Sequence, residues 1–148
     1  MSQLAGYVSE VSSYHHGETS LQETIVNLAQ TFTGSNNMNL LEPVGQFGTR
    51  LLGGKDSSSP RYIFTHLSKN FKELFNDDDL DIVDYLDDDG KSIEPKFYVP
   101  TLPIILINGA CGIGTGFSTD IPCFNPDDIK DRLLRLVEDE DSDITELT

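Results

Sequence analysis

Glycine and proline interrupt the middle of this sequence so often that neither a long helix nor a long strand fits there. Twelve glycines and seven prolines occur among the 148 residues. From Asn36 to Gly54, short apolar runs are separated by glycines, which predicts short strands or a hairpin, and Pro43 restricts one such strand to a sheet edge. Over residues 98–117, prolines and glycines exclude a long helix. With helices predicted on both sides, the expected fold class is α+β.

The first 34 residues predict two helices joined by a polar turn. Ser20, followed three residues later by Glu23, has the spacing of a capping box, and Gly34 is a suitable helix end. This succession is the plan of a helix-turn-helix, which many helical bundles share. Apolar residues at helical spacing are Leu4, Tyr7, Val8 and Val11 in the first helix and Ile25, Leu28, Ala29 and Phe32 in the second.

The rest of the chain predicts short elements of both kinds. Asn125 followed by Pro126 is a strong helix start, because asparagine caps the first turn and proline suits its first position. The chain ends at Thr148 without a helix terminator, so we expect it to be cut from a longer one. The other predicted elements are a strand at 61–65, a helix from about Leu67, an acidic stretch at 76–94 with a turn at 87–90, and a strand at 104–108.

Charge is distributed unevenly along the chain, whose formal net charge is −15. Residues 1–75 carry five basic and six acidic residues, whereas residues 76–148 carry five basic and 19 acidic ones. A polyanion such as nucleic acid is therefore expected to bind only the first half. No run reaches the roughly 18–20 apolar residues that a membrane span needs, so no membrane partner is expected.

Three familiar site patterns are incomplete. In an EF-hand loop, Asp87 and Asp89 would be calcium ligands, but Lys96 stands where a bidentate glutamate is needed. A dinucleotide-binding G-x-G-x-x-G pattern fails at its third glycine, which is Phe117. Cys111 and Cys123 match neither a zinc ribbon nor a disulfide scaffold, and we expect both to be buried reduced thiols, as in a cytosolic or nuclear protein. No metal site is predicted.

The turn between the first two helices contains His15 and His16. Adjacent side chains do not converge on one metal ion, and no set of cysteines or carboxylates completes a site. A turn that presents histidine, serine and backbone N–H groups at the start of a helix suits a phosphate instead. A structural role for one histidine, satisfied by backbone contacts, is the alternative.

Arg61 and Tyr62 are the most suggestive pair in the sequence. A tyrosine with an ordinary pKa of about 10 is a weak nucleophile at neutral pH. An adjacent guanidinium can hold a phosphate and stabilise the charge that develops when the phenolic oxygen attacks phosphorus. A tyrosine–phosphate ester would conserve the energy of the broken phosphodiester, so the nucleic-acid strand that contained this phosphodiester could be resealed without a ligation cofactor. The alternative is a tyrosine in the core.

Three long stretches resemble, in order and spacing, the breakage-reunion core of the eukaryotic-type type IIA DNA topoisomerases (topoisomerase II), including those of large DNA viruses. They are YHHGETSLQETIVNLAQTFTGSNN, GQFGTRLLGGKDSSSPRYIFT and EPKFYVPTLPIILINGACGIGTGFSTDIPCFNP. The resemblance thins only at 76–92 and after about residue 138. It implies a winged-helix domain at 1–75, an acidic linker at 76–94 and the start of a mixed α/β tower domain at 95–148.

The resemblance also implies roles for individual residues. The family's catalytic tyrosine lies in an A-R-Y or P-R-Y motif, so Tyr62 would form a 5′-phosphotyrosyl link to DNA and Arg61 would stabilise the transition state. The isoleucine of G-I-G-T-G, here Ile113, would wedge between base pairs and bend the duplex; a core position beneath the preceding strand is the alternative. Residues at DNA-contacting positions are Tyr14, His15, His16, Ser20, Arg50 and Lys55, and either histidine could assist proton transfer.

For a whole enzyme, the resemblance implies ATP-dependent cleavage and religation of double-stranded DNA, which relaxes or decatenates it. Mg²⁺ and ATP would bind domains outside this chain, so the chain alone is expected to be inactive. The enzyme would work as a homodimer in the nucleus, or in the host cytoplasm or virion of a virus. Cys111 departs from the family, which usually has glutamate there.

Two alternatives come from other functional classes. A non-catalytic winged-helix DNA-binding module would keep the helix-turn-helix, and an acidic protein-interaction module would explain the charge of the second half. Neither has a use for Arg61-Tyr62 or Ile113, and these residues favour the topoisomerase interpretation.

Overall fold

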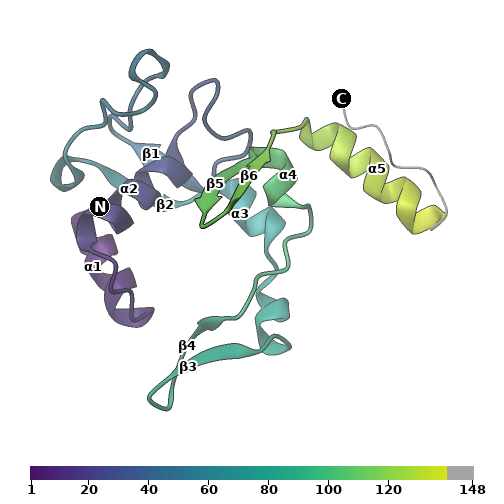
Figure 1. The fold of residues 1–148 in the computed structure, drawn as a ribbon, viewed down its shortest axis with the longest axis horizontal. Coiled ribbons are helices and arrows are strands. Elements are labelled where there is room, and N and C mark those ends of the chain that lie inside the picture. Colours follow the sequence, from purple (N-terminus) through teal and green to yellow (C-terminus); the bar gives the residue numbers. More distant parts are fainter. Residues whose placement is uncertain (140–148) are drawn as a thin grey trace. The chain divides into compact units, whose positions relative to one another are not determined.

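The computed structural model describes residues 1–139, which form two compact units, residues 1–101 and residues from 102 onward (Figure 1). Both units contain helices, and their strands pair into small two-stranded antiparallel sheets. The α+β class predicted from the sequence is therefore confirmed. None of the helices formed by residues 1–139 has the length and apolar character that a membrane crossing requires.

Two helices, α1 (Ser2–Val11) and α2 (Glu18–Ala29), open the first unit and pack on each other, as their apolar spacing predicts. Their apolar faces meet two residues from much later in the unit, Phe47 and Ile63, in one core. The buried members of this core are Met1, Ala5, Leu21, Ile25, Val26, Ala29, Phe47 and Ile63.

The predicted ends of α2 are wrong on both sides. The helix begins directly after Gly17, whose φ of 99° turns the chain sharply into the first helical residue. Ser20 and Glu23 therefore lie inside the helix, and the capping box does not form. At the other end Gln30 is extended, because its side chain reaches back to the carbonyls of a later loop, and Phe32 lies beyond the helix.

The first sheet pairs β1 (Leu41–Val44) with β2 (Phe64–Leu67), so the partner of β1 lies beyond the loop that contains the three serines at 57–59 and not in a local hairpin. Pro43 is tolerated because both strands of a two-stranded sheet are edges. Residues 60–62 form a 3₁₀ turn, and the strand that was predicted at 61–65 starts only at Phe64. The short turn replaces the start of the strand because the Tyr62 N–H bonds locally, to the carbonyl of Ser59.

The helix predicted from about Leu67 is α3 (Lys69–Leu74). It begins after Ser68, whose hydroxyl oxygen accepts the backbone N–H of Phe71 at 3.1 Å. The ring of Phe71 lies 4.8 Å from that of Phe75, which meets the ring of Tyr98 edge-on at 5.9 Å. Burial in this aromatic group, with Glu94 nearby, raises the pKa of Tyr98.

The acidic stretch forms a 3₁₀ turn at Asp77–Asp81 and then a hairpin of β3 (Tyr85–Asp88) and β4 (Lys91–Pro95). The predicted turn is confirmed, with Asp89 and Gly90 both at positive φ, as two-residue hairpin turns require. The Gly90 N–H donates to the Asp87 carboxylate at 3.0 Å. These acids thus shape a solvated turn.

The second unit contains α4 (Ile104–Asn108), β5 (Ala110–Gly114), β6 (Phe117–Ile121) and α5 (Pro126–Glu138). Residues 104–108 were predicted to be a strand and are a helix, because the carbonyl of Pro103 accepts the N–H groups of Leu106 and Ile107 and starts a helical turn. Gly109 ends it at a φ of +71°, where a Cβ would lie 2.6 Å from the Ile121 carbonyl oxygen. Only glycine fits this position.

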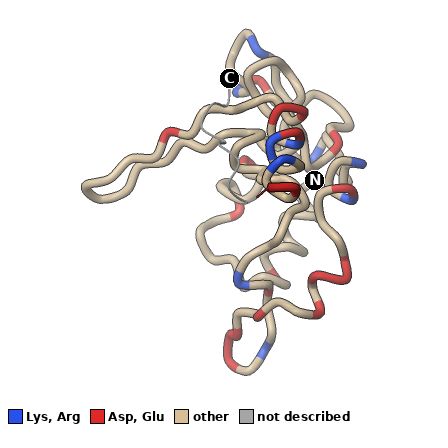
Figure 2. Tube along the Cα trace, turned by 90° about the vertical axis from the view of Figure 1, so that its right-hand side faces the viewer, with Lys and Arg blue, Asp and Glu red and all other residues tan. Residues whose placement is uncertain are grey.

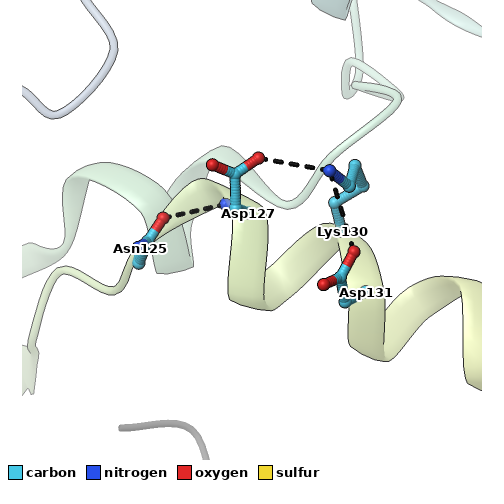
Figure 3. A network of polar contacts seen from close by, with 4 residues as sticks. All are labelled: Asn125, Asp127, Lys130 and Asp131. Carbon is cyan, nitrogen blue, oxygen red and sulfur yellow. Dashed lines mark hydrogen bonds and ion pairs between the residues drawn. The ribbon is translucent and has the colours of Figure 1, made fainter.

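The start of α5 is as predicted (Figure 3). The Asn125 side chain accepts the Asp127 N–H at 2.9 Å, and Pro126 occupies the first turn. Lys130 donates to the Asp127 carboxylate at 3.2 Å, which raises the pKa of Lys130. The buried side chain of Ile129 anchors the helix in its unit, where α5 packs on α4.

The expectation of two buried thiols is wrong. Cys111 and Cys123 are both exposed and are not disulfide-bonded. Cys111 lies on the hairpin β5–β6, whose residues 111–120 are all exposed, and Cys123 lies in the connection that follows it. A two-stranded ribbon without a covering layer cannot bury its side chains on either face.

Candidate functional site

Tyr62 lies at the end of the 3₁₀ turn Pro60–Tyr62, with its side chain 69% exposed. Its backbone N–H donates to the Ser59 carbonyl at 2.9 Å. The next residue, Ile63, is extended and only 1% exposed, because it enters the helical core. The buried Ile63 thus fixes the backbone next to Tyr62, while the tyrosine side chain itself is exposed to solvent. The alternative of a core tyrosine is therefore wrong.

Arg61 is exposed beside Tyr62, and its guanidinium carbon lies 5.7 Å from the centroid of the tyrosine ring. This is the distance of a cation–π contact. The contact keeps a planar, permanently charged donor next to the phenol. A phosphate placed between the two groups would meet a nucleophile and a stabilising cation together.

Arg50 and Lys55 are exposed on the loop that precedes the turn, Arg50 within a 3₁₀ turn at Arg50–Leu52. The buried side chain of Gln30 pins this loop, since its Nε2 donates to the Phe47 carbonyl at 2.9 Å and to the Gly54 carbonyl at 3.2 Å. The two cations are therefore presented by a constrained backbone.

A second set of hydrogen bonds, between Thr49 and Asp56, closes the same loop and is called the clasp below. The carboxylate of Asp56 accepts the Thr49 N–H at 2.7 Å and the Thr49 hydroxyl at 2.6 Å. These bonds, the hydroxyl bond foremost, lower the pKa of Asp56. Gly48 has a φ of +101°, and a Cβ there would lie 2.5 Å from the Gly54 carbonyl oxygen. The loop therefore closes on itself too tightly for any other residue at position 48.

The rings of Tyr14, His15 and His16 gather in the turn between α1 and α2. The ring centroids of His15 and His16 lie 4.3 Å apart, and those of Tyr14 and His16 lie 5.5 Å apart and nearly perpendicular. Tyr14 packs partly on the core, whereas both histidines are exposed, and His15 Nδ1 lies 3.2 Å from the Ser13 carbonyl oxygen. Ser20 is exposed within the first turns of α2.

Ile113 is 93% exposed near the tip of the β5–β6 hairpin, opposite Ser118. The alternative that it fills the core beneath a strand is therefore wrong. The residues on both sides of it, Gly112 and Gly114, carry no side chains, and Phe117 nearby is 84% exposed. The hairpin has one acid, Asp120, near its base and is otherwise uncharged (Figure 2). Ile113 thus projects from a nearly neutral ribbon.

The structure brings the predicted residues together in two groups of contacts, Arg61 with Tyr62 and Tyr14 with both histidines. Ile113 lies in the second unit. Among residues 1–139, no group of three or more His, Cys, Asp or Glu side chains lies close enough together to hold a metal ion.

The residues that hold the loop were not predicted from the sequence; they are Gln30, Thr49 and Asp56. The carbonyls that Gln30 binds lie 17 and 24 residues away, so no local pattern marks it. Thr49 and Asp56 are seven residues apart in a segment without periodicity. The available signal was the pair of glycines, Gly48 and Gly54, whose positive φ values allow the close approach.

Comparison with known proteins identifies relatives of this chain. The family model that describes the A subunit of DNA gyrase/topoisomerase IV matches residues 1–148. Human DNA topoisomerase 2-alpha is 57% identical over 141 residues, which are 95% of this chain and 9% of the human protein. The mitochondrial DNA topoisomerase 2 of Dictyostelium discoideum is 56% identical over 134 residues, 90% of this chain and 10% of that protein.

A solved structure shares the fold as well as the sequence. It is the DNA-binding, cleavage and re-ligation domain of Plasmodium falciparum topoisomerase II, which superimposes with a TM-score of 0.91 at 55% identity and covers 93% of this chain and 19% of that one. The chain spans about a tenth of the length of the curated relatives it matches. It belongs to the family of DNA gyrase/topoisomerase IV A subunits and corresponds to part of the cleavage and re-ligation domain of topoisomerase II.

Proposed function

We propose that this chain works within a type II DNA topoisomerase, where Tyr62 opens one DNA strand by forming a 5′-phosphotyrosyl link. The observation that carries the proposal is the exposed Arg61–Tyr62 pair, held one residue from the buried Ile63. The sequence identity of more than half to DNA topoisomerase 2 supports it.

The proposed chemistry exchanges one phosphate ester for another. The phenolic oxygen of Tyr62 attacks phosphorus, a Tyr–O–P bond forms, and the P–O3′ bond breaks. The phenolic proton leaves to a base, for which His15 or His16 is the candidate, and the departing 3′ oxygen takes up a proton. Arg61 stabilises the charge on the phosphoryl oxygens. Religation reverses every step, so the strand needs no external energy to be resealed.

Double-stranded DNA is the proposed partner, bound by the exposed residues of the first unit and bent by Ile113. In this proposal α1, α2 and the β1–β2 sheet form a winged-helix domain, and the second unit begins a tower domain. The DNA contacts are assigned to Tyr14, His15, His16, Ser20, Arg50 and Lys55.

Topoisomerase activity also requires Mg²⁺ and ATP, and residues 1–139 contain no cluster that fits the metal. Both are proposed to bind domains of the full-length enzyme outside this chain. A homodimer would cut both strands of the duplex. Its proposed compartment is the nucleus, or the host cytoplasm or virion for a viral enzyme; one relative is named as mitochondrial.

The proposal is tested by Tyr62→Phe in the full-length enzyme. We expect the covalent protein–DNA adduct to disappear, because the nucleophilic oxygen is gone, while the affinity for DNA stays nearly unchanged. The adduct is measured by denaturing gel electrophoresis with labelled plasmid, and the affinity by filter binding at fixed salt.

The matched control is Tyr7→Phe, since Tyr7 is also an exposed tyrosine, at 63%, but lies on α1. This variant should cleave as the unaltered enzyme does. An adduct formed by the Tyr62→Phe enzyme would place the nucleophile elsewhere and would leave the non-catalytic DNA-binding module as the better interpretation.

A further inference from the structure

A cleft of about 610 Å³ adjoins the turn that carries Arg61 and Tyr62. This volume lies within the range of roughly 300–1,000 Å³ typical of small-ligand sites. One wall is a single stripe of α2, formed by Thr19, Gln22, Glu23, Val26 and Asn27. The other wall is the loop that runs from Gly53 to Pro60, the first residue of the catalytic turn.

The loop wall is held in place by bonds of its own backbone. The carbonyl of Gly54 accepts a hydrogen bond from the Gln30 side chain, and the N–H of Gly54 donates to the Thr49 carbonyl at 2.9 Å. The Ser58 N–H donates to the Gln46 carbonyl at 2.9 Å. The cleft is therefore preformed, so a ligand would not have to order its walls.

The two walls offer different chemistry. The helix wall carries the amides of Gln22 and Asn27 and the carboxylate of Glu23, which suit the donor and acceptor edges of nucleobases. The loop wall carries the ammonium of Lys55 and the hydroxyls of Ser57, Ser58 and Ser59, which suit a sugar–phosphate backbone. Within residues 1–139, these three hydroxyls have no hydrogen-bond partner.

The carboxylate of Glu23 helps to decide the ligand. An acid among phosphate-binding groups would repel a bare phosphate, whereas it can accept a hydrogen bond from the exocyclic amino group of cytosine. The helix wall thus fits a base better than a backbone. A nucleotide with its base toward α2 and its phosphate toward Lys55 satisfies both walls.

We propose that this cleft binds the deoxynucleotide next to the phosphate that Tyr62 attacks and reads its base, which gives the enzyme a sequence preference at that position. The inference rests on the proposed function. The cleft lies close enough to Tyr62 to hold a neighbouring nucleotide, because Pro60, which lines the cleft, is two residues from Tyr62. Their Cα atoms are at most about 7.6 Å apart. Neighbouring nucleotides of a strand follow each other at a rise of about 3.4 Å.

The test is a cleavage profile of the full-length enzyme on a duplex library with randomised bases around the cut, with Mg²⁺ present and the covalent ends sequenced. We expect a base preference at one nucleotide beside the cut. Asn27→Ala should weaken it by about tenfold, the discrimination of one good amide–base pair. Glu23→Gln should change which base is preferred there.

Two further variants separate base reading from general damage. Ser57→Ala, on the loop wall, should lower cleavage equally at all sequences, because it removes a backbone contact. Gln3→Ala, on the exposed face of α1, should leave the profile unchanged.

The inference is overturned if the profile is unchanged in both helix-wall variants, Asn27→Ala and Glu23→Gln, or if these two variants lose cleavage uniformly over all sequences. Either result leaves the proposed function intact as long as Tyr62→Phe abolishes the adduct. If Tyr62→Phe retains the adduct, the proposed function itself fails, and the two failures are thereby distinguished.

Discussion

The segment around Tyr62 and the hairpin around Ile113 both present an exposed side chain, but their backbones are supported differently. Tyr62 is followed by the buried Ile63, and its loop is pinned by Gln30 and closed by the clasp of Thr49 and Asp56. Ile113 lies on a two-stranded ribbon whose residues 111–120 are all exposed, and its ladder to β6 is the support.

This difference matches the proposed tasks. A nucleophile gains most of its advantage from accurate placement, and small displacements are costly in rate. A wedge has to protrude and enter a base step, and a slender, nearly uncharged ribbon can do so with little backbone in the way. The comparison predicts that substitutions around Tyr62 cost stability, whereas those at the hairpin tip change DNA shape alone.

The largest effect on stability is expected from Ile63→Ala. Ile63 is 1% exposed and lies in the core with α1 and α2. Removing its buried methyl and methylene groups should lower the free energy of unfolding by about 2–5 kcal/mol. Urea unfolding of the chain measures this, and a loss below about 0.5 kcal/mol would show that the core does not anchor the turn Pro60–Tyr62.

Gln30→Ala should cost about 1–3 kcal/mol, because the carbonyls of Phe47 and Gly54 lose the donor that satisfies them. DNA affinity of the full-length enzyme should fall as well, since the loop that presents Arg50 and Lys55 loosens. Gln3→Ala, an exposed glutamine on α1, serves as the control in both measurements. A drop in stability without any drop in affinity would separate the loop from DNA binding.

Asp56 predicts a pH dependence with a defined sign. Its pKa in the folded state is lowered, mainly by the hydrogen bond from the Thr49 hydroxyl. The clasp therefore contributes its full stability above the unfolded-state pKa of about 3.9, and this contribution is lost as the pH falls through the lower folded-state value. The carboxyl ¹³C shift of Asp56 should titrate below the normal aspartate range, and Thr49→Ala should move it back; a normal titration in the unaltered chain contradicts the clasp.

Ile113→Ala should have the smallest effect on stability, within about 0.5 kcal/mol, because the side chain is 93% exposed. In the full-length enzyme the same substitution should reduce DNA bending, measured by energy transfer between labelled duplex ends. Unchanged bending would remove the proposed role of Ile113, and a loss of stability comparable to that of Ile63→Ala would erase the contrast between the two regions.

Local patterns were reliable where the partners of a residue lie nearby in sequence. The spacing of apolar residues predicted α1 and α2, the run at 87–90 predicted a turn, and Asn125-Pro126 predicted a helix start, and the structure contains all of these. The long matching stretches predicted the family, which the comparisons confirm, whereas the role that the P-R-Y motif implies for Tyr62 stays a prediction.

Local patterns were unreliable where a distant group supplies the decisive contact. Residues 104–108 have strand composition but form a helix, since Pro103 starts a helical turn and Gly109 must fit beneath the Ile121 carbonyl. The end of α2 was misplaced because Gln30 leaves the helix to bind the loop. Cys111 was expected to be buried and is exposed on the hairpin β5–β6, because composition does not tell whether a two-stranded ribbon will be covered.

By itself, therefore, the sequence determined the α+β class, the two opening helices, the turn signals and the residues whose types suit phosphoryl transfer, because these depend on spacing and chemistry within a few residues. The tertiary structure alone decided that Tyr62 faces solvent while Ile63 is buried. It also decided that Gln30 and the Thr49–Asp56 clasp hold the loop that carries Arg50 and Lys55, and that a cleft opens between α2 and the serines at 57–59. These features arise from contacts between residues far apart in the chain, which only packing brings together.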